Sequence, residues 1–175
     1  MEDPTREAPY SRPQLWLLTA LRMAIGWHFL YEGVVKLWSP NWSAGGYLMG
    51  ASGPLAGLFQ AMASSPQALS AVDLLNAWGL TLVGLGFMLG SFTRLAAIGG
   101  MILLAFYYLA QPPLFGASYG TPTEGSYLLV NKNLIELLAI AVLYHFPTGH
   151  RLGLDRLLRQ SPATRWARAM MDGGG

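Results

Sequence analysis

Long runs of apolar residues, separated by polar stretches, divide the chain into four predicted helices. The runs cover residues 14–38, 72–89, 95–109 and 131–146. Each comes near the ~20 residues that an α-helix needs to cross the hydrocarbon core of a bilayer. Backbone polar groups in lipid must bond within their own segment, which a helix allows and an isolated strand does not. The pattern therefore predicts an all-α integral membrane protein built as a four-transmembrane-helix bundle.

Polar tails flank this predicted bundle. We expect residues 1–13 to form an N-terminal cytoplasmic tail, residues 14–148 the transmembrane domain and residues 149–175 a basic cytoplasmic tail. Leucines alternate with arginines in the last stretch, which predicts an amphipathic helix on the cytoplasmic leaflet. The first apolar run is too long for a signal peptide and no small-residue cleavage site follows it, so we expect it to be retained.

The distribution of basic residues predicts the orientation. Arginines occur in both tails and at position 94, whereas residues 39–71 and 110–130 contain no Lys or Arg. Positive residues favour the cytoplasmic side, so both ends are predicted inside, with two long outer loops. Within the first loop, residues 53–63 predict a short helix that is interfacial or re-entrant. We expect the protein in the cytoplasmic membrane of a bacterium or archaeon.

The composition narrows the classes of function. The chain is 53% hydrophobic and only 11% charged, whereas a soluble domain is about 25% charged. Membrane lipid is therefore an expected partner. The net charge of +2 predicts no nucleic-acid binding. The absence of cysteine excludes thiolate chemistry and cysteine-ligated iron–sulfur clusters within this chain, and no flavin or nucleotide motif is present.

Ionisable residues inside the predicted spans are the candidates for chemistry. The first span carries Arg22, His28, Glu32 and Lys36, which at ~100° per residue fall within an arc of about 120°. A charge at the bilayer centre costs ~2.5–3.5 kcal/mol on insertion scales. This polar face is therefore expected to point into the bundle. Arg22 lies deeper than the other three, and the sequence offers no partner for it.

Two other predicted helices bring polar groups to the same outer half of the membrane. These groups lie at the outer start of the second span and in the outer turns of the fourth. We expect the catalytic residues to be His28, Glu32 and Glu136, and the quinone- or substrate-binding residues to be Arg22, Lys36, Asp73, Asn76, Asn131 and Lys132. Such a cluster predicts a small-molecule site. The alternative is an ion-paired core that fixes helix register, with the lysines extended to the outer headgroups.

Other patterns predict structure without chemistry. Gly86 and Gly90 form a GxxxG pair, which is typical of close helix packing in lipid. Aromatic residues near the outer ends of the spans, Tyr47 and Tyr107 among them, are expected in an interfacial belt. His28 and His145 lie at different depths, so a haem with two histidine ligands is not predicted, and we expect no metal site.

Six short motifs, spaced over about residues 15–158, make the chain resemble the DoxX/DoxD family of small four-helix membrane proteins. The motifs occupy residues 22–36, 42–48, 76–79, 90–94, 131–136 and 153–156. The resemblance implies a membrane subunit of an oxidoreductase that passes electrons from thiosulfate to quinone, with tetrathionate as the product. It also implies a second subunit, so other membrane or periplasmic subunits are expected partners.

Three functions remain open on the sequence alone. In the first, a quinone-linked oxidoreductase subunit holds quinone at Arg22, His28 and Glu32, and Lys36 and Lys132 attract an anionic reductant. In the second, a non-catalytic accessory subunit docks into a larger complex through the GxxxG surface and the basic tail. A small transporter or lipid-handling protein is the third, and the absence of a visible inverted repeat disfavours it.

Overall fold

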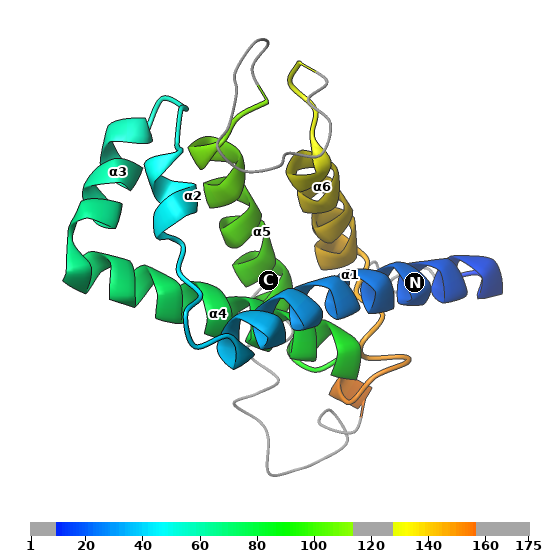
Figure 1. Ribbon diagram of the computed structural model, residues 1–175. Coiled ribbons are helices and arrows are strands. Elements are labelled where there is room, and N and C mark those ends of the chain that lie inside the picture. The colour runs from blue at the N-terminus through cyan, green and yellow to red at the C-terminus, as the bar shows by residue number, and fades with distance from the viewer. Residues whose placement is uncertain (1–9, 114–127, 157–175) are drawn as a thin grey trace.

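The computed structural model describes residues 10–113 and 128–156, and the regular elements in these ranges are helices (Figure 1). They are α1 (Arg12–Trp38), α2 (Gly45–Met49), α3 (Ala56–Ser64), α4 (Pro66–Leu89), α5 (Thr93–Ala110) and α6 (Lys132–His145). The all-α prediction is confirmed for these residues. Most of the predicted C-terminal amphipathic helix lies outside the described residues.

The helix ends follow local capping signals. In α1, the Ser11 side chain accepts a hydrogen bond from the Gln14 N–H, and the Gln14 side chain accepts one from the Ser11 N–H. α4 begins at Pro66, six residues before the predicted start of the second span at about residue 72. Ser65 caps this helix, and Pro66 suits its first position because no N–H is needed there.

The four long helices form two antiparallel pairs that pack across each other. α1 lies along α4, and α5 lies beside α6, as Figure 1 shows. α4 also packs against α5, and a short turn joins the two helices. All four helices contribute to one apolar core, whose most buried members are Phe29, Leu80, Phe87, Ala97, Leu104 and Ile140.

Glycines allow α1 and α4 to approach closely. A methyl group added to Gly84 would collide with the backbone nitrogen of Leu30, and one added to Gly33 would collide with Thr81. The predicted GxxxG pair has other contacts. Gly86 lies against Ala96, and Gly90 ends α4 in a left-handed conformation at φ 63°. Because both glycines contact their own chain, this pair is not a free docking surface.

The segment predicted as the first outer loop folds into α2 and α3, which cover the ends of α4 and α5. Ala44, Leu48, Phe59 and Ala110 form a second apolar cluster there. The predicted short helix at residues 53–63 is found at Ala56–Ser64. Its position relative to a bilayer stays a prediction.

Two of the described helices, α4 and α5, are long and apolar enough to cross a membrane. α1 and α6 are not among these helices. α1 carries the ionisable face described above, and α6 has only 14 residues. Four spans and the inward orientation of both ends therefore remain predictions.

Candidate functional site

An ion pair between α1 and α6 forms the centre of the polar cluster. Nδ1 of His28 lies 2.7 Å from Oε1 of Glu136, and 35% of the His28 side chain and 12% of the Glu136 side chain are exposed. The other carboxylate oxygen of Glu136, Oε2, is buried and has no hydrogen-bond partner. The sequence predicted that these two residues converge, and the structure brings them into direct contact.

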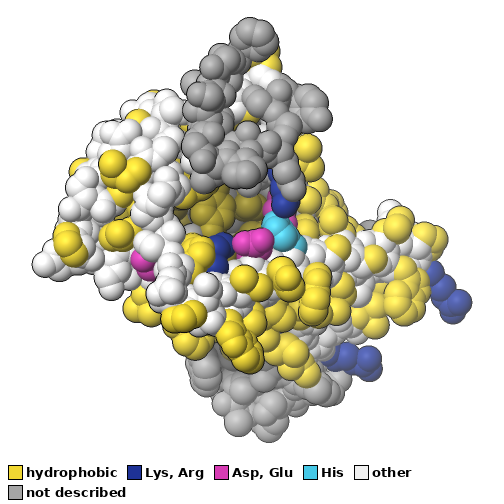
Figure 2. Space-filling model, in the orientation of Figure 1, with side chains coloured by type: hydrophobic (Ala, Val, Ile, Leu, Met, Phe, Trp, Pro, Cys, Tyr) yellow, Lys and Arg dark blue, Asp and Glu magenta, His cyan; other side chains and the backbone are white. Residues whose placement is uncertain are grey.

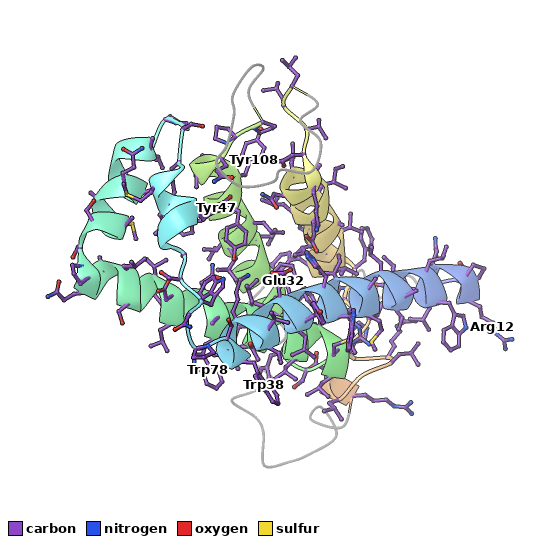
Figure 3. All side chains as sticks on the ribbon, viewed as in Figure 1. Arg12, Glu32, Trp38, Tyr47, Trp78 and Tyr108 are labelled. Carbon is purple, nitrogen blue, oxygen red and sulfur yellow. The ribbon has the colours of Figure 1, made fainter. Side chains whose placement is uncertain are left out.

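Glu32 and Lys36 lie next to this pair on α1. Lys36 Nζ donates to Glu32 Oε2 at 3.0 Å and lies 5.3 Å from the centre of the Trp42 ring. Glu32 also interacts electrostatically with His28 and Lys132. Figure 2 shows acidic, basic and histidine side chains gathered in a hollow above α1. In Figure 3, Glu32 lies on the side of α1 that faces α5 and α6.

A second polar pair joins α4 to α5. Asn76 Nδ2 donates to the hydroxyl oxygen of Tyr107 at 2.6 Å, and Asn76 Oδ1 is buried without a partner. The Tyr47 hydroxyl donates to the Tyr107 carbonyl oxygen at 3.0 Å, and the two rings meet edge to face with centroids 5.9 Å apart. The charge of Glu32 acts on Tyr107. This pair is therefore electrostatically linked to the α1 cluster.

Tyr107 has a contact that the sequence did not predict. It is expected in an interfacial belt, and its depth in a membrane stays a prediction, but its hydroxyl bonds to the buried Asn76 of α4. The spacing of small and apolar residues on α5 contains the missed signal. Ala96, Gly100 and Leu104 are buried at helical spacing, and Tyr107 continues that face by one turn.

Asp73 and Asn131, both predicted to bind ligand, hydrogen-bond to the backbone. Asp73 Oδ1 accepts from the Ala44 N–H at 2.7 Å, which ties the first outer loop to α4. Asn131 Oδ1 accepts from the Leu134 N–H at 3.0 Å and caps the N-terminus of α6. Both side chains thus hold elements that carry site residues.

Arg22 lies away from the cluster. Six residues separate it from His28, or about 9 Å along a helix. Its side chain is buried, and Nη2 donates to the Leu152 carbonyl oxygen at 2.7 Å. The charge of Asp155 acts on the guanidinium. No partner for Arg22 could be predicted, because this one comes from 130 residues further along the chain.

The arrangement suits proton exchange with a bound molecule. Imidazole changes protonation near neutral pH, and a carboxylate hydrogen bond fixes the orientation of its ring. Glu32 is 48% exposed at its side chain and can exchange protons with water. Polar groups of α1 and α6 are therefore in direct contact, the pair on α4 and α5 lies near them, and the Glu32 side chain is exposed.

A family model described as DoxX matches residues 17–111, more than half of the chain. The matched segment contains α4, α5 and nearly all of α1, and so includes His28, Glu32, Asn76 and Tyr107. Glu136 lies beyond the matched range. Neither the curated proteins nor the solved structures contain a match to this chain.

Proposed function

The chain belongs to the DoxX family, and from that premise we propose that it is a membrane subunit of a quinone-linked oxidoreductase. The quinone site lies at the ion pair of His28 and Glu136 and at the neighbouring Glu32. Electrons come from thiosulfate or another small reductant, through this chain or through a partner subunit.

The observation that carries the proposal is the His28–Glu136 pair with the buried, unpartnered oxygen of Glu136. Buried polar atoms nearly always have hydrogen-bond partners, so an orphan such as Glu136 Oε2 indicates a group that a ligand satisfies. A quinone bound there would supply the two-electron, two-proton chemistry. His28 and Glu136 would hold its oxygen and exchange a proton with it, since imidazole and carboxyl groups serve as general acids and bases and these two are in contact.

The charged residues around the pair have separate roles in this proposal. Glu32 is half exposed and exchanges protons between water and the pair. Lys36 and Lys132 place positive charge near the outer opening, which favours the approach of an anionic reductant. Oxidation of two thiosulfate ions to one tetrathionate releases the two electrons that one quinone takes up.

We place the protein in a bacterial or archaeal cytoplasmic membrane as a multi-pass protein. The face of α1 next to its polar stripe exposes large apolar side chains, namely Trp16, Trp27, Tyr31, Val35 and Trp38. Lipid contact accounts for such a stripe, whereas water does not. Arg12 and Trp38 mark its two ends in Figure 3.

Quinone binding tests this function directly. The full chain in lipid nanodiscs is titrated with decylubiquinone, and binding is followed by quenching of tryptophan fluorescence. We expect binding to the wild type and about tenfold weaker binding to His28→Gln, the loss of one hydrogen bond at ~1.4 kcal/mol. His145→Gln is the matched control, because that histidine is exposed at the far end of α6.

An organic extract of the purified protein gives an independent result. Quinone in the extract agrees with the proposal. Failure of the wild type to bind or to carry quinone, together with a fixed set of copurifying subunits, would replace the proposal with the accessory-subunit alternative.

A further inference from the structure

We infer that Asn76 and Tyr107 form the second anchor of the same site, opposite the anchor made by His28 and Glu136. The ligand is then a para-quinone ring held at both oxygens, in its oxidised and its reduced form. This inference rests on the proposed quinone site and adds residues and a ligand geometry to it.

The chemistry of the ligand sets a requirement for each anchor. The carbonyl oxygens of a quinone only accept hydrogen bonds, whereas the hydroxyls of a hydroquinone also donate them. A site that keeps the ring through both redox states needs one free donor and one free acceptor at each end. An anchor of only one kind would leave a buried polar group unsatisfied in one of the states.

The first anchor meets this requirement when the His28–Glu136 pair carries one proton more than a neutral imidazole beside a carboxylate, because Nε2 of His28 then bears a hydrogen and donates. Glu136 Oε1 is bonded to His28, which leaves Oε2 as the free acceptor. Among the described residues, Nε2 of His28 makes no hydrogen bond and is the free ring nitrogen. Because His28 is partly exposed, a ligand in the hollow can reach this nitrogen.

The second anchor meets it in the same way. With Asn76 Nδ2 donating to the Tyr107 hydroxyl oxygen, the Tyr107 O–H is the free donor and Asn76 Oδ1 the free acceptor. The oxygen and nitrogen of an amide can be interchanged in a structure. That exchange leaves Asn76 Nδ2 as the donor and the Tyr107 oxygen as the acceptor, so either assignment gives one of each.

Glu32 lies one turn along α1 from His28, on the side that faces α5 and α6 (Figure 3). It is also close enough to Tyr107 for an electrostatic interaction, so the two anchors lie near one another. Tyr47 holds the second anchor by its hydrogen bond to the Tyr107 carbonyl and by the edge contact between the rings. In Figure 3, Tyr47 lies on α2 across from α5, with Glu32 below it on α1.

The test uses the full chain in nanodiscs with two probes, decylubiquinone and decylubiquinol. We expect Asn76→Leu to weaken binding of both probes about tenfold. Tyr107→Phe keeps the ring contact with Tyr47 and should weaken one redox form more than the other. A tenfold difference between the forms shifts the midpoint potential of the bound quinone by about 30 mV. A purely structural role for Tyr107 would not produce that shift.

Tyr108→Phe is the matched control, because the Tyr108 hydroxyl donates to the Leu129 carbonyl oxygen at 2.8 Å, outside both anchors. It should leave both affinities and the potential unchanged. If Asn76→Leu does not fold, judged by its thermal unfolding, Tyr107→Phe alone decides. Wild-type affinities and potential in Tyr107→Phe would overturn the second anchor while the first stands. A wild type that binds neither probe would overturn both the anchor and the proposed function.

Discussion

Gly84 lies where α4 meets the backbone of α1, and no side chain fits between them. Gly26 and Gly33 lie equally close to α4 from the side of α1. The two helices can therefore be in contact only because these residues have no Cβ. The sequence shows many glycines but does not distinguish these from the others. Gly57 of α3, for example, has open space where a Cβ would be.

Gly84→Ala should therefore destabilise the protein, by ~1–3 kcal/mol as for other overpacked cores. The added methyl meets the Leu30 backbone, which cannot move without shifting α1. Thermal unfolding in detergent measures the effect. Gly57→Ala is the control and should be neutral or slightly stabilising, because alanine is the better helix former. Equal unfolding temperatures for the two variants would contradict this account of the α1–α4 contact.

The residues of the candidate site divide into those whose relation is local in sequence and those that meet only through the packing of helices. Helical spacing was enough to place His28, Glu32 and Lys36 on one face, because that relation is local. The contact between His28 and Glu136 could be predicted only by comparing the depths of two predicted spans in the membrane. The structure contains this contact. The bond between Asn76 and Tyr107 was missed, since nothing near either residue indicates the other.

The N-terminus of α5 depends on a residue far along the chain. Phe92, which precedes the helix, has a left-handed conformation at φ 51° and provides no side-chain cap. Asp155 takes over that role. It accepts from the Phe92 N–H at 2.8 Å and from the Thr93 hydroxyl at 3.2 Å. The negative carboxylate also suits the positive end of the helix dipole.

Asp155→Ala should destabilise the fold by ~1.5–3 kcal/mol, the usual range for hydrogen bonds to a charged group. It also removes the negative charge nearest the buried Arg22. Adding Arg22→Gln should then cost less than it does in the wild type, because the two residues share one cluster. Chemical unfolding of the four combinations measures this coupling. Arg156→Gln, at an exposed neighbouring position, is the control. Additive effects of the two changes would disprove the coupling.

At the scale of the whole molecule, the two helix pairs place the outer loop elements and the C-terminal segment at different ends. α2 and α3 cover the ends of α4 and α5 that carry Asp73 and Ala110. Residues 149–156 dock on the opposite end, where Leu154 and Asp155 bond to the α4–α5 turn. The positive-inside rule assigns the first end to the outside and the second to the cytoplasm.

Single cysteines test this topology, since the chain has none of its own. Gly57→Cys and Arg156→Cys introduce thiols at exposed positions at the two ends. With a membrane-impermeant maleimide on intact cells, we expect labelling of the first and no labelling of the second. Permeabilised cells should label both. The reverse pattern on intact cells would invert the orientation. Labelling at both positions would place both on the outside and rule out the odd number of spans, three, that is predicted between them.

The sequence by itself determined the four long helices, the apolar and polar faces of α1, and the family. These follow from patterns within one turn or one span, where neighbours in sequence are neighbours in space. The tertiary structure decided which faces meet. It paired Arg22 with a carbonyl from the C-terminal segment, gave Asp155 to the start of α5 and turned Tyr107 toward Asn76. Such contacts join residues on different elements, and their partners depend on how the helices cross, which no local pattern contains.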